Sequence, residues 1–248
     1  DRYVINKYDQ GAKTPGGEIV VTPLFQVKAW LVRRKEAPVE QVIERHLARL
    51  RAGAPRLGKP NAHLATGEFL MVPNLYDAHF NKRSADGAYT LERAAADFKA
   101  VADAVVARAR ALALPVERVL FPVGNDALHA DNLVGDTTDG TRLETVADQR
   151  DAIDAICDAC EYAALRFFDL APVDIVAIES NHDRQGTFWL GKVLEAYFHR
   201  TPGVTVDATR APNKYYVYGQ TLLGLQHGDK IKPDALAVLM ATEAPDAW

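Results

Sequence analysis

The chain has 248 residues, of which 48% are hydrophobic, and its net charge at neutral pH is −4. It can bury a sizeable core, either as one domain with an appendage or as two small domains. The charge excludes a protein whose whole surface binds nucleic acid, and no apolar run reaches membrane length, so we expect no membrane partner. Cys157 and Cys160 lack a second ligand pair at zinc-finger spacing and predict core thiols of a reduced, cytoplasmic protein.

The N-terminal 60 residues read as a separate segment. Residues 1–30 contain short β-prone pieces interrupted by Gly and Pro, which predicts a hairpin or an extended arm. A helix is predicted from Pro38 to Gly53. We therefore expect an accessory segment at 1–60, made of a β arm and a basic helix, and a second domain at 61–248.

Positive charge is concentrated between residues 28 and 59. This stretch holds nine Lys or Arg against three Glu, a net charge of +6 that leaves −10 for the remainder. A solvated helix face is the commoner explanation for such a run. The alternative is a contact with nucleic acid, for which the candidate residues are Arg33, Arg34, Lys35, Arg45 and Arg49.

Strands and helices alternate through the middle of the chain. The hydrophobic patterns predict strands at 68–72, 119–123 and 174–178, a helix that Thr90 caps and Pro115 ends, and further helices at 143–170 and 188–199. Strands near 204–206, 214–218 and 221–225 follow. This order favours an α/β sandwich over a pure Rossmann sheet.

Four short motifs recur in a fixed order: Asp77-Ala-His79, Gly124-Asn-Asp126, Asn181-His182-Asp183 and His227-Gly-Asp229. Each supplies oxygen or imidazole ligands for a divalent cation. Three of them follow a predicted strand, where open α/β sheets gather their active sites. Any one of these motifs alone is as typical of a turn, and only their joint order and setting indicate a metal site.

Two cations held about 3.5–4 Å apart can neutralise a phosphate ester and activate a water molecule. Asp126 is the best candidate for a carboxylate that bridges two ions. Asp77 and His79 can converge on one ion, while Asn181 and His227 offer ligands to the other. This mixture of nitrogen and oxygen suits manganese, iron or zinc better than calcium, and manganese is the expected metal.

His182 lies beside a ligand position and could protonate the departing oxygen, because histidine titrates near neutral pH. Asp183 or another acceptor would orient its ring. His129, Asp131 and Asp229 lie next to the ligand loops and are candidate supporting residues.

The ordered motifs from Asp77 to His227 resemble the calcineurin-like metallophosphoesterase family, and the stretches 124–132, 214–216, 224–229 and 240–245 look like those of its bacteriophage-encoded members. The resemblance implies a four-layer αββα sandwich for residues 61–248. It also implies two metals, one held by Asp77, His79 and Asp126 and the other by Asp126, Asn181 and His227, with His182 as the catalytic acid.

The sequence departs from the family pattern in three places. Asn125 is inserted into the second motif, Ser180 replaces a glycine, and no histidine follows His227, although the family ends with Gly-His-x-His. Together with a first residue other than Met, the missing motif predicts a chain that is truncated after Trp248.

The function expected from these features is a metal-dependent phosphoesterase, and more narrowly a phage nuclease that hydrolyses DNA phosphodiesters in the host cytoplasm. Two alternatives stay open. One is a small-molecule or protein phosphatase. The other is a non-catalytic phage module for DNA metabolism or assembly, with an incomplete metal site.

Overall fold

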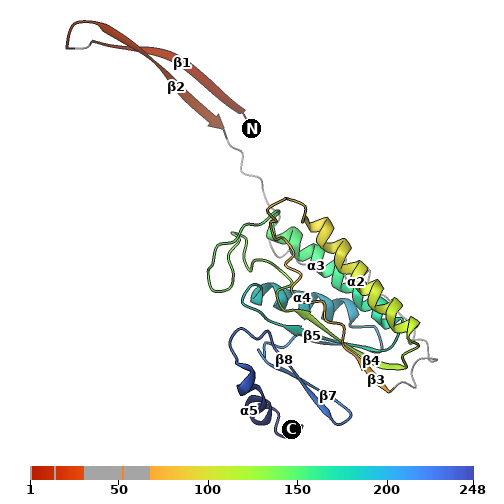
Figure 1. Ribbon diagram of the computed structural model, residues 1–248. Coiled ribbons are helices and arrows are strands. Elements are labelled where there is room, and N and C mark those ends of the chain that lie inside the picture. The colour runs from red at the N-terminus through yellow and green to blue at the C-terminus, as the bar shows by residue number, and fades with distance from the viewer. Residues whose placement is uncertain (1, 14, 31–51, 53–67) are drawn as a thin grey trace. The chain divides into compact units, whose positions relative to one another are not determined.

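The computed structural model describes residues 2–13, 15–30, 52 and 68–248 (Figure 1). The chain divides into two compact units, Asp1–Arg45 and His46–Trp248, which are described separately. The helix predicted at 38–53 lies outside the described residues apart from Ala52. The five basic candidates for nucleic-acid contact also lie outside them: Arg33, Arg34, Lys35, Arg45 and Arg49.

The first unit contains a two-stranded antiparallel hairpin. Strand β1 (Arg2–Lys13) pairs with strand β2 (Ile19–Trp30), with Arg2 opposite Trp30 and Lys13 opposite Ile19. The glycine- and proline-rich residues 15–18 form the connection, so the structure shows the first of the two predicted alternatives, a hairpin or an extended arm.

The second unit is a mixed α/β structure built around a parallel sheet. Its elements are β3 (Phe69–Met71), α2 (Leu91–Ala111), β4 (Val116–Gly124), α3 (Gln149–Phe168), β5 (Val173–Ile178), α4 (Arg184–Phe198), β6 (Val204–Asp207), β7 (Lys214–Tyr218), β8 (Thr221–Leu225) and α5 (Pro233–Glu243). Strands β3 to β6 are parallel and lie side by side in chain order. The predicted alternation of strands and helices is confirmed.

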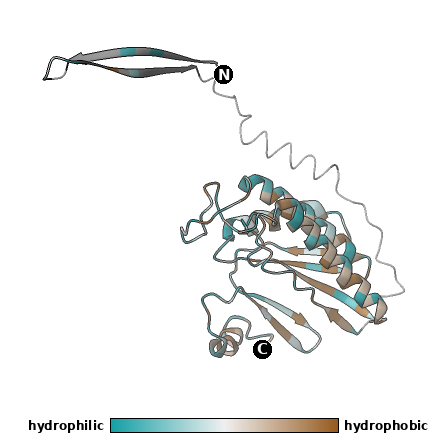
Figure 2. Ribbon diagram, turned by 45° about the horizontal axis from the view of Figure 1, so that its top comes forward, coloured by the Kyte–Doolittle hydropathy of each residue, from teal (hydrophilic) through white to brown (hydrophobic). Residues whose placement is uncertain are grey.

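The two faces of this sheet carry different layers. On one face Val119, Phe121 and Ile175 belong to the main core with helices α2, α3 and α4. On the other face Leu120 and Val176 pack against the antiparallel hairpin of β7 and β8. Alternate residues of each strand face opposite sides of the sheet, because side chains in a strand repeat every two residues. In Figure 2 the helices over the sheet mix hydrophilic and hydrophobic residues, as expected for helices with one buried face.

Helix α5 lies on the hairpin and forms a further layer (Figure 1). The Glu243 carboxylate accepts hydrogen bonds from the Tyr215 hydroxyl and the Asn213 amide, and the Met240 side chain packs over Gly224. The sequence patterns did not predict this helix. Its apolar residues recur without one dominant face and none of them is buried, so periodicity gives little signal.

The helices of the main layer begin and end for local reasons. Thr90 caps α2 by accepting a hydrogen bond from the Arg93 amide, as predicted. Helix α3 begins at Gln149 instead of near residue 143. The cause is Asn81, whose side-chain oxygen accepts hydrogen bonds from the amides of Val146 and Ala147 and holds them in a loop.

Both cysteines lie in helix α3 as buried free thiols, as predicted. Among the helices that the structure describes, none combines the length and the apolarity that crossing a bilayer would require.

A polar network ties the hairpin to the sheet. Asp174, the second residue of β5, accepts hydrogen bonds from Arg118, from the Thr205 hydroxyl and from the Tyr216 hydroxyl. Its side chain is largely buried, whereas that of Arg118 is 38% exposed. Removing the carboxylate would leave three donors without their acceptor.

We expect Asp174→Ala to lower the free energy of unfolding by about 2 kcal/mol, less than for a fully buried ion pair because Arg118 reaches solvent. Urea denaturation measures the change. Asp97→Ala is the control, because Asp97 pairs with Arg93 on the exposed surface of α2 and such pairs contribute little. Equal effects of the two variants would contradict the anchoring role of Asp174.

Candidate metal centre

The predicted motifs meet at one edge of the unit formed by residues 68–248. Asn125 and Asp126 directly follow β4, Asn181 and His182 lie just after β5, and His227 lies two residues after β8. Asp77 and His79 occupy the loop after β3. These are carboxyl ends of strands, so the sheet gathers side chains that are far apart in the sequence.

Backbone hydrogen bonds hold the first two motif loops together. The Asp77 amide donates to the Asn125 carbonyl over 3.2 Å, and the His79 amide donates to the Asp126 carbonyl over 2.9 Å. Of the non-glycine residues described, six have a positive φ, and these four are among them. Such backbone strain persists only where surrounding contacts impose it, and it concentrates at functional sites.

Gly124 makes this geometry feasible at the end of β4. Its φ is +86°, and a Cβ atom there would lie 2.5 Å from the Ile178 carbonyl oxygen and 2.5 Å from the Thr187 methyl group. The Asn125 amide then donates to that same Ile178 carbonyl over 2.8 Å. A larger residue would push β4 away from β5 and from the start of α4.

Asp126 lies at the centre of the gathered residues. Its Oδ2 atom is 4.0 Å from Nε2 of His79 and 3.7 Å from Nε2 of His227. Its other oxygen, Oδ1, is buried and has no hydrogen-bond partner. A buried carboxylate oxygen without a partner is costly, so a cation that binds it would relieve that cost.

One side of Asp126 is formed by Asp77 and His79. Oδ1 of Asp77 lies 2.9 Å from Nε2 of His79, and the side chain of Asp77 is 77% exposed. Ligand atoms of these two residues and of Asp126 all lie within 4.8 Å of one another, as one metal ion requires.

The other side is formed by Asn181 and His227. Nε2 of His227 lies 2.8 Å from the Asn181 side-chain oxygen, and its Nδ1 lies 2.8 Å from the side-chain oxygen of Asn125. Asn125 therefore orients the ring, as outer partners of metal-binding histidines do. From the sequence Asn125 is only an insertion in the second motif, and this role is not predicted. Its position beside Asp126 was the available signal.

Three histidines cluster on the Asp77 side of the site. Ring nitrogens of His79, His129 and His182 lie within 4.8 Å of one another, and Nδ1 of His79 is 3.3 Å from Nδ1 of His129. Burial lowers the pKa of His79, and burial beside the two other rings lowers the pKa of His129 to about 4. Both rings are neutral at pH 7, the form that binds a metal.

The ring of His182 is held by a backbone carbonyl. Its Nδ1 lies 2.9 Å from the carbonyl oxygen of His129, and because a carbonyl only accepts, the hydrogen is on Nδ1. Of the two predicted alternatives, Asp183 or another acceptor, the structure shows the second. The buried Asp183 carboxylate accepts hydrogen bonds from the Leu128 amide and the Ser180 hydroxyl.

The structure separates the three supporting candidates. His129 belongs to the histidine cluster. Asp131 does not face the site, because one oxygen accepts from the amides of Gln185 and Gly186 at the start of α4 and the other accepts from the Thr138 hydroxyl. Asp229 is exposed and lines a neighbouring cavity.

Complete burial of the Asp183 carboxyl group raises its pKa to about 6. Two good donors reach its carboxylate, but the loss of solvent outweighs them. Because its carboxylate accepts hydrogen bonds from both Leu128 and Ser180, Asp183 connects the loop after β4 to the loop after β5.

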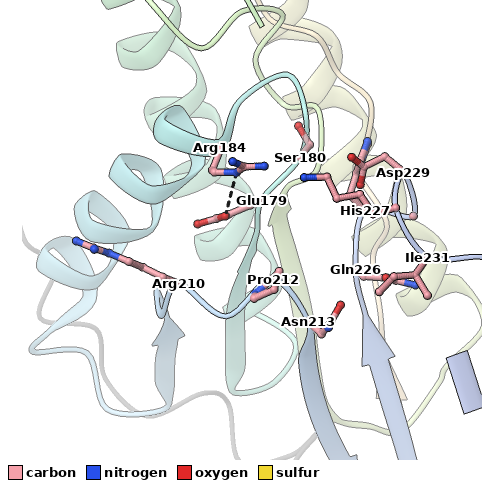
Figure 3. Close-up of a pocket in the computed structure, with 12 residues that line it drawn as sticks. Glu179, Ser180, Arg184, Arg210, Pro212, Asn213, Gln226, His227, Asp229 and Ile231 are labelled. Atoms are coloured by element: carbon pink, nitrogen blue, oxygen red, sulfur yellow. Dashed lines mark ion pairs between the residues drawn. The ribbon is translucent and has the colours of Figure 1, made fainter. Parts of the chain in front are cut away.

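A cavity of about 390 Å³ opens beside His227 (Figure 3). Its lining comes from the loops after β5, β6 and β8, and includes Arg184, Arg210 and Asp229. Nε of Arg184 lies 3.6 Å from an oxygen of Glu179, the pair marked in Figure 3. In Figure 3 the Arg184 guanidinium lies near Glu179 at the edge of this cavity, whereas the Arg210 side chain points away from His227.

We compared the chain with models of known protein families, with curated proteins and with solved structures, and none of them matched.

Proposed function

We propose that the protein is a metal-dependent phosphoesterase that uses two divalent ions. The observation that carries this proposal is the Asp126 carboxylate, which lies between His79 and His227 and has a buried oxygen without a partner. Bridging carboxylates in two-metal sites need this arrangement, because each ion also requires ligands of its own.

The residues fit two ions. Asp77, His79 and Asp126 would hold one, and Asp126, Asn181 and His227 would hold the other. Their imidazole nitrogens and their carboxylate and amide oxygens suit manganese first, and iron or zinc as alternatives. When bound, such a pair supplies charge neutralisation on the phosphate and an activated water molecule.

His182 is the proposed proton donor to the leaving oxygen. The His129 carbonyl fixes its Nδ1–H, which leaves Nε2 to carry the proton that is transferred. Its ring centroid lies 4.8 Å from that of His79, so the donor would act beside the metal ligands.

The layers of the larger unit support the finer assignment of an αββα sandwich of the metallophosphoesterase type. Helices α2 to α4, the parallel sheet, the hairpin of β7 and β8, and α5 follow one another in that order. The proposed substrate is DNA, with a phosphodiester at the metals. Arg184 and Arg210 in the adjoining cavity support an anionic substrate.

Hydrolysis of bis(p-nitrophenyl) phosphate tests this function. The metal-free chain is expected to be inactive and to gain activity when Mn²⁺ is added, with release of nitrophenolate as the measurement. A chain that hydrolyses only the monoester would instead be a phosphatase. A chain that binds no more than one ion weakly and hydrolyses neither ester would be a non-catalytic module.

A further inference from the structure

A second hollow lies next to the cavity that contains His227. It has a volume of about 350 Å³, and Phe188 and Trp189 of helix α4 line it. Glu179, Arg184 and Arg210 line both spaces. The two spaces therefore adjoin. An extended ligand could reach from the candidate metal ligand His227 to the aromatic rings of Phe188 and Trp189.

The aromatic part of this hollow faces solvent. Trp189 is 48% exposed, although α4 buries its neighbour Leu190 almost completely. The rings of Phe188 and Trp189 lie 5.3 Å apart at 68° to each other, and the Arg210 guanidinium lies 5.0 Å from the Phe188 ring centroid. A cation–π contact accounts for the pairing of Arg210 with Phe188. It does not account for the exposed indole.

The hollow holds two guanidinium groups and two carboxylates, and the guanidinium groups make few ion pairs. Arg210 makes no ion pair within 4 Å among the residues that the structure describes, and Arg184 has only its contact of 3.6 Å with Glu179. The other acidic residue, Asp131, is occupied with backbone amides at the start of α4. Both guanidinium groups are therefore placed to bind phosphate oxygens.

We propose that Arg184, Phe188, Trp189 and Arg210 form a subsite for an unpaired nucleotide of single-stranded nucleic acid. This inference rests on the proposed function, because it places that nucleotide next to the phosphodiester at the metal centre. The base stacks on Trp189, while the arginines hold the flanking phosphates. Stacked bases of a duplex offer no free face to the indole, so single strands are preferred over duplexes.

Binding of a fluorescently labelled oligothymidylate to the full chain, measured by anisotropy in EDTA, tests the subsite without hydrolysis. Trp189→Ala is expected to weaken binding about tenfold, because stacking on one base carries a loss of this order. Trp189→Phe keeps an aromatic face and is expected to restore most of the affinity. Arg210→Ala is expected to weaken binding and to reduce its dependence on salt.

Trp248→Ala is the matched control, since Trp248 is 63% exposed and lies outside the hollow. It is expected to bind like the unmodified chain. Circular dichroism checks that the half-exposed Trp189 can be replaced without unfolding, and the Phe variant gives a second test of the same contact. Unchanged affinity in Trp189→Ala, or an equal loss with duplex DNA, would overturn the proposal.

Failure of this inference can be told from failure of the proposed function. Hydrolysis of bis(p-nitrophenyl) phosphate involves no nucleobase. If the chain hydrolyses this ester but its oligonucleotide affinity does not depend on Trp189, the subsite is rejected and the phosphoesterase function still stands. Binding that depends on Trp189 in a chain without Mn²⁺-dependent hydrolysis would keep the nucleic-acid surface and reject the catalytic assignment.

Discussion

Replacing Asp126 by Ala is expected to empty both metal positions and to abolish Mn²⁺-dependent hydrolysis. Oδ2 of Asp126 lies about equally close to Nε2 of His79 and Nε2 of His227, so its loss affects both sides. A bridging carboxylate also offsets the repulsion between two dications. Calorimetric titration with Mn²⁺ measures the number of ions bound.

Asn181→Ala provides the comparison, because the side-chain oxygen of Asn181 contacts His227, in the second half of the site. This variant is expected to weaken the binding of one ion and to leave the ligands of the other in place. Asp229→Ala is the matched control for removing a nearby carboxylate, since Asp229 is exposed and belongs to neither ligand set. If Asp126→Ala and Asn181→Ala retain the same metal content, Asp126 does not bridge.

Replacing His182 by Ala is expected to lower turnover by about 10²–10⁴-fold while the number of bound ions stays the same. In the proposed mechanism His182 donates a proton and is not needed as a ligand. The loss should shrink for esters with good leaving groups, which need little protonation. Steady-state rates on a series of substituted phenyl diesters, together with metal analysis, give both readouts.

His199→Ala is the control for this series. The ring of His199 is exposed and contacts the Ala196 carbonyl at the end of α4, away from the ligands. The alternative is that His79, His129 and His182 together bind a metal ion, because their ring nitrogens lie close enough to do so. If His182→Ala empties a metal position, His182 is a ligand and the role of proton donor is wrong.

Much of the architecture could be predicted because its causes are local. The two-residue period of β4 and β5, the Thr90 cap of α2 and the turns rich in glycine and proline all act within a few residues. The parallel strands then place the motif loops at one edge. For that reason the meeting of Asp77 with Asp126 could be predicted without a structure.

The division of roles among neighbouring residues could not be predicted in this way. Asp131, Asp183 and Asn125 all lie in or beside the motif loops, yet one caps α4, one braces two loops and one orients His227. Each role depends on which donor from a remote segment reaches the side chain. Spacing along the chain carries no information about that partner.

The sequence by itself determined the α/β pattern, the β-prone character of residues 1–30 and the set of candidate ligands. Only the tertiary structure decided that Asp126 lies between two histidines, that His129 holds His182, and that Trp189 faces solvent beside the site. The physical reason is the distance along the chain over which each interaction acts. Periodicity and capping act over one or two turns, whereas burial and hydrogen-bond partners are fixed when strands distant in sequence pack together.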